Sequence, residues 1–247
     1  MVSELIITSV IYYTYKLLRK EKYSYVELSN NQLLIGFDKF KRPIVADMNI
    51  CPHVLVSGLP NSGKSKCICI MLKNLRKANI VICGGFKEDY IGISYREIIG
   101  EDLLNIFLDS VLDNLYKREI PLYIVFEELG TIRSKKTKDK IQELLCIARH
   151  YNIFIIGVIQ IATKENCSFK DLFNTRVTFK QIGEQNYRVI LGMPIEEEYR
   201  NLKQKEFIML SDKLYNGKTY LIKEYEDLCR PTVAICCPLL RLRIKLV

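Results

Sequence analysis

The segment Gly58-Leu-Pro-Asn-Ser-Gly63-Lys64-Ser65 constrains the fold of this chain more than any other stretch. It has the spacing G-x-x-x-x-G-K-[ST] of a phosphate-binding loop. A short apolar run, residues 54–57, precedes the loop and predicts a buried strand. The apolar pattern of a helix follows it, carried by Ile68, Met71, Leu72 and Leu75. The motif requires this order of strand, loop and helix, and the intact context disfavours the alternative of a chance match in an ordinary turn.

The residue types of the loop suit a nucleotide. Gly58 and Gly63 let the backbone curl so that its N–H groups point at phosphate oxygens, and the following helix adds the positive end of its dipole. Lys64 would reach the β- and γ-phosphates, and Ser65 would hold Mg²⁺. We therefore expect ATP and Mg²⁺ as cofactors. The predicted nucleotide-binding residues are Gly58, Leu59, Pro60, Asn61, Ser62, Gly63, Lys64 and Ser65.

Two further apolar strands end in polar side chains. Residues 122–126 lead directly into Glu127 and Glu128, which resemble a Walker B site. One carboxylate, Glu127, would belong to the Mg²⁺ shell, and the next would polarise the attacking water. Two solvated surface acids are the alternative. Gln160 ends the strand predicted over residues 153–159, where it either senses the γ-phosphate or caps the strand.

Strands that alternate with helices predict an α/β fold of the RecA-like P-loop type, with a mainly parallel sheet covered by helices on both faces. A small N-terminal β-hairpin is expected to precede the phosphate loop. Its strands are predicted at 33–37 and 43–47. Near the other end, strands at 206–210 and 218–222 predict a late hairpin with Asn216-Gly217 at its turn.

The chain of 247 residues has a net charge of +9, which is a weak prior for nucleic acid or an anionic membrane surface. Basic residues gather between positions 131 and 140, where they either track a phosphate backbone or form the solvated start of a helix. These candidate DNA contacts are Arg133, Lys135, Lys136, Lys138 and Lys140. The nine cysteines form no C-x-x-C pair, which favours buried thiols in a reducing cytosol.

The N-terminal stretch is apolar and aromatic up to residue 18 and is followed by Arg19, Lys20 and Lys22. Its uncharged core, residues 5–15, is shorter than the ~20 residues that span a bilayer. A short membrane anchor, an interfacial helix and an ordinary packed helix all fit this pattern. We expect two parts, an apolar segment over 1–25 and a motor domain over 26–247. The protein would be cytoplasmic, with attachment to the inner face of the cell membrane through residues 1–22.

Several segments resemble the motor domain of FtsK/SpoIIIE-type DNA translocases, which belong to the FtsK–HerA superfamily of P-loop ATPases. They follow the family order from about residue 33 to residue 222. These segments are Leu34-Ile-Gly-Phe-Asp38, Arg42-Pro-Ile-Val-Ala-Asp47, Pro52-His-Val-Leu-Val-Ser-Gly58, Asn174-Thr-Arg176-Val-Thr-Phe179 and Tyr187-Arg188-Val-Ile-Leu191. Departures include Glu127 where the family has Asp, and Gly84-Gly-Phe-Lys87 in place of an Asp-Pro-Lys turn.

The resemblance implies a RecA-like ATPase that assembles as a ring, usually a hexamer, and translocates DNA. Arg176 or Arg188 would then act in trans, since a guanidinium neutralises charge on the γ-phosphoryl oxygens of a neighbouring site. A structural ion pair, such as Arg188 with Glu184, is the alternative. DNA transfer or packaging for a mobile element or phage is the function expected. A phage assembly or secretion ATPase acting on protein, and a nucleotide-gated scaffold with little turnover, are the competing hypotheses.

Overall fold

The computed structural model describes residues 27–165 and 168–220. The predicted membrane segment over residues 1–22 and the predicted domain boundary at residue 25 lie outside these ranges. Within them, no helix is both long enough and apolar enough to cross a membrane.

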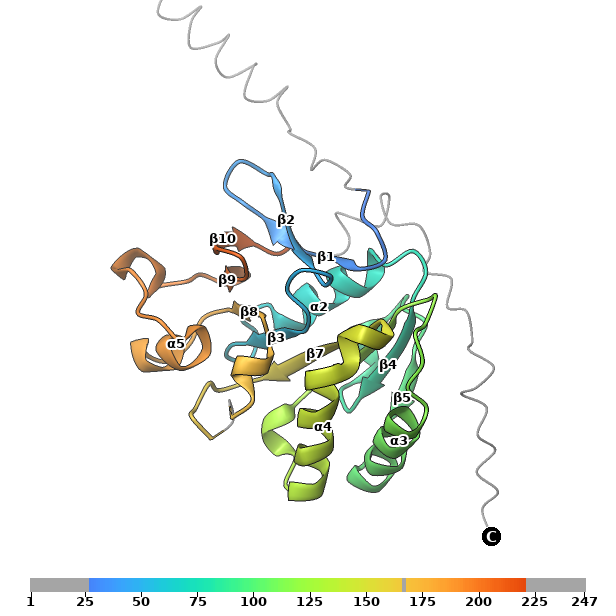
Figure 1. The fold of residues 1–247 in the computed structure, drawn as a ribbon. Helices are drawn as coiled ribbons and strands as arrows, with labels where there is room; N and C mark the ends of the chain where they lie inside the picture. Colours follow the sequence, from blue (N-terminus) through green and yellow to red (C-terminus); the bar gives the residue numbers. More distant parts are fainter. Residues whose placement is uncertain (1–26, 166–167, 221–247) are drawn as a thin grey trace, which may run out of the picture.

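Ten strands in the described part of the chain form one sheet in the order β2-β1-β10-β9-β8-β3-β7-β6-β4-β5 (Figure 1). Six of them are mutually parallel, as the alternation of strands and helices predicts. These are β3 (Val54–Ser57), β4 (Asn79–Cys83), β5 (Arg96–Ile98), β6 (Leu122–Phe126), β7 (Ile153–Ile159) and β8 (Thr175–Thr178). Four antiparallel strands extend the sheet: β1 (Gln32–Phe37), β2 (Pro43–Asp47), β9 (Glu206–Leu210) and β10 (Leu214–Lys218).

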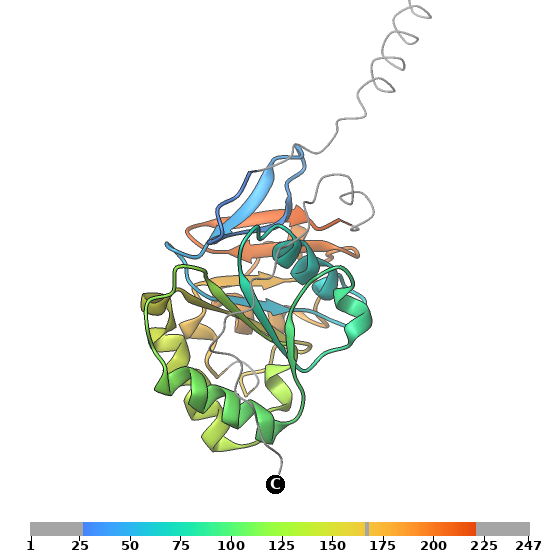
Figure 2. The ribbon, with the colours of Figure 1, turned by 90° about the vertical axis from the view of Figure 1, so that its right-hand side faces the viewer.

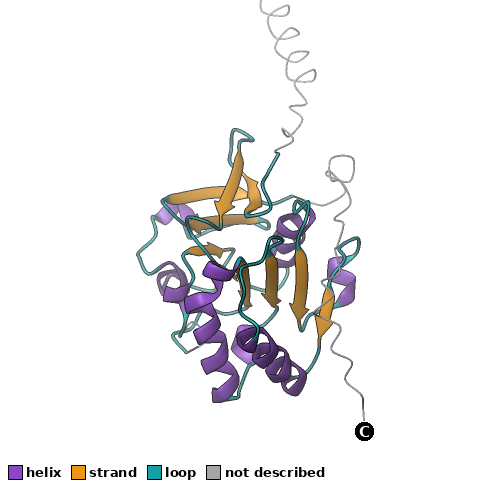
Figure 3. Ribbon diagram, turned by 45° about the vertical axis from the view of Figure 1, so that its right-hand side comes forward, coloured by secondary structure: helices purple, strands orange, loops and turns teal. Residues whose placement is uncertain are grey.

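Helices cover both faces of this sheet, which confirms the predicted layers. On one face lie α3 (Glu101–Asp113), α4 (Lys135–Ile147) and α5 (Glu184–Leu191). The other face carries α2 (Lys64–Lys73), which packs on β1, and the 3₁₀ turn η1 (Lys87–Tyr90). Figures 2 and 3 show α2 on the side of the sheet opposite to α3 and α4. Because strands β3, β4, β6 and β7 are buried on both faces, their sequences are almost continuously apolar.

The predicted N-terminal hairpin is confirmed, but the register predicted for the late hairpin is wrong. The turn between β9 and β10 lies at residues 211–213, where the N–H of Ser211 donates to the carbonyl of Lys213. Asn216 and Gly217 lie inside β10 instead. A Cβ on Gly217 would be 2.7 Å from the carbonyl oxygen of Phe37. This glycine therefore allows β10 to lie close to β1, a constraint that a turn motif does not reveal.

His53 connects the first residues of β3 to the neighbouring β7. Its backbone has φ +65°, and its buried Nδ1 accepts the N–H of Ile155 at 3.0 Å. Nδ1 must stay unprotonated to accept this hydrogen bond. Burial lowers the pKa of His53 to about 4, because the imidazolium loses its hydration inside the sheet.

This geometry predicts a pH-dependent contribution of His53 to stability. In the unfolded chain an imidazole titrates near pH 6.5, so between pH 6.5 and 4 the unfolded state binds more protons and stability falls as pH falls. Urea unfolding at pH 7 and pH 5 should show this loss, which amounts to about 2 kcal/mol for His53.

The matched variant is His53→Asn, because asparagine tolerates a positive φ and does not titrate. The wild-type protein should lose about 2 kcal/mol more than this variant between the two pH values, since other titrating groups are common to both. Equal pH dependence in the two proteins would contradict the assignment.

Candidate nucleotide-binding site

The predicted phosphate loop, the two carboxylates and Gln160 lie along one edge of the sheet, where the parallel strands end. β7 is hydrogen-bonded to both β3 and β6, and β6 is hydrogen-bonded to β4. The phosphate loop follows β3, Gln160 follows β7, and Glu127 follows β6. Ligands bind at this edge in open α/β sheets. The structure therefore brings together residues that are up to 102 positions apart in the sequence.

The phosphate loop needs its two glycines for steric reasons. Gly58 and Gly63 have φ values of +152° and +124°. A Cβ on Gly58 would lie 2.7 Å from both the Cβ of Phe179 and the Oγ of Ser62. Any larger residue would push the loop away from the strand that supports it.

Lys64 is the first residue of α2, and its side chain folds back over the loop. Its Nζ donates to the carbonyl oxygens of Gly58, at 2.5 Å, and Leu59, at 3.0 Å. Burial lowers the pKa of Lys64, while the negative charges of Glu128 and Glu127 act in the opposite direction. The ammonium group thus lies near Glu127 and Glu128, the two carboxylates that the sequence predicts for the same site.

Glu127 is half-buried at the tip of β6, against the turn that follows β4. Its N–H donates to the carbonyl of Cys83 at 3.1 Å, and a Cβ on Gly85 would lie 2.7 Å from its Cγ. Gly85, at φ +90°, therefore makes room for this carboxyl. Burial raises the pKa of Glu127 to about 7, and the charge of Asp89 acts in the same direction. Its Oε1 is buried without a hydrogen-bond partner in the described structure.

Glu128 has a different environment, because it contacts the residue at the tip of β7. Burial raises its pKa, while hydrogen bonds from the backbone of Gly130 and from Gln160 favour its charged form. Its Oε2 is buried without a partner among the described residues. Both carboxyls line a cavity of about 270 Å³ beside the Gly84-Gly85 turn. The pair thus combines one carboxyl of raised pKa with one that Gln160 orients.

These donors fit a magnesium nucleotide. Within the described residues, no group of three or more His, Cys, Asp and Glu could hold a metal ion alone. Mg²⁺ usually takes only one or two protein carboxylates and completes its shell with water and phosphate oxygens. Ser65 and Glu127 would hold the ion, which would neutralise charge on the phosphates. The unpaired Oε1 of Glu127 is the observation that supports this fit.

A buried polar network beneath the loop was not predicted from the sequence. Gln181 donates from Nε2 to the Oγ of Ser57 at 3.0 Å and to Oγ1 of Thr178 at 3.2 Å, and its N–H donates to the Tyr187 hydroxyl. The network ties the end of β3 to β8 and α5. Ser57 and Gln181 are 124 positions apart, so no local pattern reveals their contact.

The segment before β9 also supports the loop and was not predicted. The N–H of Lys205 donates to the Ser62 carbonyl at 2.7 Å, and the Gln204 side chain donates to the Asn61 carbonyl at 3.1 Å. These bonds fix the outer half of the loop, where Asn61 takes φ +59°.

The predicted DNA contacts divide into two kinds. Arg133, Lys135 and Lys136 are exposed and Lys138 is half-buried at the start of α4. Lys140 is only 8% exposed, and its Nζ pairs with Asp109 of α3 at 2.6 Å. Lys140 therefore holds the two helices together, and the cationic surface consists of the exposed Arg133, Lys135 and Lys136 with the half-buried Lys138.

The two arginines proposed to act in trans also differ. Arg176 is largely buried and donates to the Asp171 carboxylate and to the carbonyl of Phe173, so it holds β8 to the preceding turn. Arg188 is 59% exposed and pairs with Glu184. Glu184 also pairs with Arg200, at 3.2 Å. The carboxylate therefore keeps a partner without Arg188.

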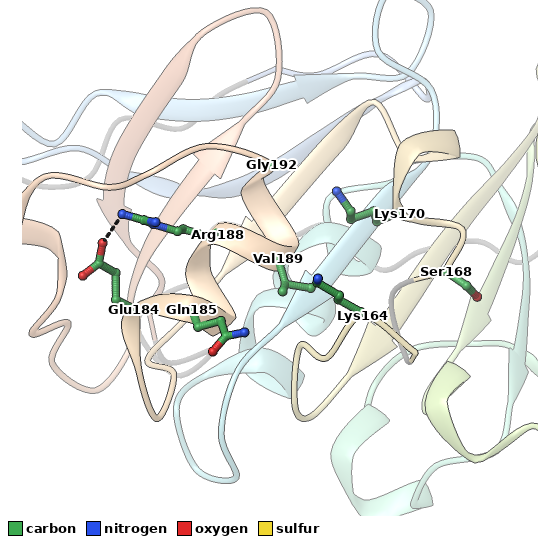
Figure 4. Close-up of a pocket in the computed structure, with 8 residues that line it drawn as sticks. All are labelled: Lys164, Ser168, Lys170, Glu184, Gln185, Arg188, Val189 and Gly192. Atoms are coloured by element: carbon green, nitrogen blue, oxygen red, sulfur yellow. Dashed lines mark hydrogen bonds and ion pairs between the residues drawn. The ribbon is translucent and has the colours of Figure 1, made fainter.

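Arg188 borders a hollow of about 830 Å³. Figure 4 shows Arg188 and Glu184 on α5, and Lys164 and Lys170 on the segment between β7 and β8. Of the two arginines, Arg188 is thus the one that presents its guanidinium at the surface.

Comparisons with known proteins support the fold and leave the substrate open. No family model matches the sequence, and no curated protein sequence matches it. The structure is similar to the pCW3 conjugation coupling protein TcpA, in its monomer form with ATPgS. The TM-score is 0.67 at 16% identity, over 79% of this chain and 67% of that one.

Two ATPase structures are also similar. The cytoplasmic domain of the Thermomonospora curvata Type VII secretion ATPase EccC gives a TM-score of 0.65 at 16% identity, over 79% of this chain and 29% of that one. For EssC (ATPases 2 and 3) from Geobacillus thermodenitrificans the TM-score is 0.64 at 11% identity, over 83% of this chain and 48% of that one. The chain thus spans less than half of these two structures. The fold implied by the resemblance to FtsK-type motors is confirmed.

Proposed function

We propose that this protein is an ATPase in which Lys64 and Ser65 bind the magnesium nucleotide and Glu128 polarises the attacking water. The observation that carries the proposal is the convergence of the phosphate loop, the two carboxyls and Gln160 on one edge of the sheet. Charge builds on the γ-phosphoryl oxygens during transfer, and a positioned ammonium and metal ion stabilise it.

We further propose that the protein assembles as a ring, a hexamer as in most motors of this type, and that hydrolysis drives DNA through it. The process served would be DNA transfer or packaging for a mobile element or phage. The exposed cations of α4 support a polyanionic substrate, and so does the similarity to a conjugation coupling protein. Attachment to the inner membrane face through residues 1–22 stays a prediction. An ATPase acting on protein is the alternative, which the similarity to a Type VII secretion ATPase favours.

The deciding measurement is the ATP hydrolysis rate with no DNA, with duplex DNA and with single-stranded DNA, at stated salt. We expect DNA to stimulate the rate. Hydrolysis that is indifferent to DNA would favour the secretion hypothesis, and nucleotide binding without hydrolysis would favour a scaffold.

The same assay tests the site residues. Glu128→Gln should lower the rate by ~10²–10⁴ and retain bound ATP, because it removes the positioned base and leaves the phosphate loop intact. Lys64→Ala should lose nucleotide affinity. Glu143→Gln, an equivalent change on an exposed acid of α4, is the matched control. Unchanged turnover in the Glu128→Gln protein would show that Glu128 is not the base, and the role would then be assigned to Glu127 or to another residue.

The cationic surface of α4 gives a second prediction. Lys135→Gln/Lys136→Gln should weaken DNA binding for all sequences and reduce the salt slope by about one unit per lost phosphate contact. Lys77→Gln/Lys117→Gln makes the same charge change at exposed positions before β4 and β6, on the opposite sheet edge. Identical salt slopes in the two double variants would leave the α4 lysines as ordinary surface charges.

Arg188 gives a third prediction, for mixed rings. Arg188→Ala should lower hydrolysis by ~10³–10⁵ if its guanidinium completes a neighbouring site. Mixing these subunits with Lys64→Ala subunits should restore activity, since some interfaces then combine an intact loop with an intact arginine. Mixed rings that never exceed their parents would show that Arg188 acts within its own subunit.

Arg176→Ala serves as the comparison, because its contacts with Asp171 and Phe173 predict a loss of stability instead. A stability loss in Arg188→Ala of similar size would indicate a structural role for Arg188 as well. Thermal unfolding of the two variants distinguishes these outcomes.

A further inference from the structure

The tip of the β1–β2 hairpin, residues 38–42, presents an aromatic ring to solvent among basic side chains. Phe40 is 64% exposed. The Nζ of Lys39 lies 5.2 Å from the centre of its ring, and the guanidinium carbon of Arg42 lies 5.1 Å from it. An exposed ring with adjacent cations combines a stacking surface with phosphate-binding groups.

The tip is held rigidly by Asp38. Its Oδ1 accepts the N–H groups of Phe40, at 2.8 Å, and Arg42, at 2.9 Å, and its Oδ2 accepts Nε of Arg42 at 2.7 Å. The N–H of Asp38 in turn donates to the Arg42 carbonyl at 2.9 Å. Because the backbone on both sides of the ring is fixed, little conformational entropy remains to be lost when a ligand binds.

More cations lie at the base of the tip. A hollow of about 530 Å³ is lined by Lys39, Lys41 and Lys218, together with Tyr199 and Tyr220. Two acids also line it, but both are hydrogen-bonded. Asp38 is bound within the tip, and Glu206 accepts the N–H of Lys203 at 2.8 Å. The ligand that complements this surface is an anionic polymer.

The position of the tip favours nucleic acid over a lipid surface. At the start of β1, Glu27 pairs with Arg76 and Asn30 accepts the N–H of Lys77, so the described chain begins beside the end of α2. The tip lies at the other end of β1. At that end, the tip borders the hollow that the segment before β9 helps to form. The same segment is hydrogen-bonded to the phosphate loop. The tip therefore lies at the end of β1 that is farther from residue 27.

We propose that the tip binds single-stranded nucleic acid, with an unpaired base stacked on Phe40 and the adjacent phosphates contacting Lys39, Lys41 and Lys218. A base face matches the exposed ring, and stacking of this kind tolerates any sequence. The inference rests on the proposed DNA-dependent function, and it adds a site for an unpaired strand that is separate from the α4 surface.

The chain contains no tryptophan, so Phe40→Trp places a single fluorescent reporter at the tip. Titration with oligo-dT should quench this fluorescence and should do so less at high salt. Ile50→Trp is the matched control, because Ile50 is 71% exposed beyond β2, at the other end of the hairpin. Its fluorescence should not change.

Affinity gives a second measurement, by anisotropy of labelled oligo-dT with the otherwise unchanged protein. Phe40→Ala should weaken binding roughly 10-fold, and Phe40→Leu should weaken it similarly, because leucine keeps apolar area and loses the stacking face. Nucleotide binding should be unchanged in both variants.

The outcomes separate this proposal from the proposed function. If the wild type binds DNA and responds to it in the hydrolysis assay while Phe40→Trp stays silent, the tip proposal is overturned and the function stands. If Phe40→Trp fluorescence shifts to the blue only with anionic phospholipid vesicles, the tip is a membrane contact. If the wild type binds neither oligo-dT nor duplex DNA, both proposals fail.

Discussion

The half-buried positive charge of Lys64 is the interaction on which the rest of the site depends. Removing an ammonium group from water is costly unless the group is paired and hydrogen-bonded, and here two loop carbonyls and two carboxylates compensate the cost. The carbonyls require the curled backbone of Gly58 and Gly63, and the carboxylates require β6 to end two strands away from β3. The shape of the loop and the order of the strands therefore both stabilise the ammonium group of Lys64.

The same burial sets the properties of the two carboxyls. Glu127 and Glu128 are adjacent in sequence, yet they point to different surroundings because side chains alternate along an extended chain. Glu127 lies against the Gly84-Gly85 turn and has a pKa raised to about 7, whereas Glu128 is hydrogen-bonded by Gln160. Groups with such different environments suit separate roles, one toward a metal ion and one toward water.

Local patterns predicted the parallel half of the molecule well. Strands β3, β4, β6 and β7 are almost continuous apolar runs, and the polar residues that follow β6 and β7 mark the edge where the site lies. The short strand β5, with the sequence Arg-Glu-Ile, has no such pattern and was not predicted. The turn and second strand of the late hairpin were misplaced because Gly217 fits both a turn and a strand that lies close to its neighbour, and only the position of Phe37 decides between them. Gln181 and Lys205 were missed for a related reason, since their contacts with the loop region join distant segments.

The sequence alone does not show which basic residues form structural ion pairs and which are free to bind a ligand. Lys140 belongs by sequence to the same basic cluster as Lys136, but it lies one turn further along α4, where α3 packs against it and Asp109 pairs with its Nζ. The remaining cations of α4 and the hairpin tip lie at opposite parts of the sheet. β1 and β6 are six strand positions apart, which corresponds to roughly 30 Å at ~4.8 Å per strand. Sites this far apart share no side chains, so the losses in binding free energy caused by substitutions at the two sites should add.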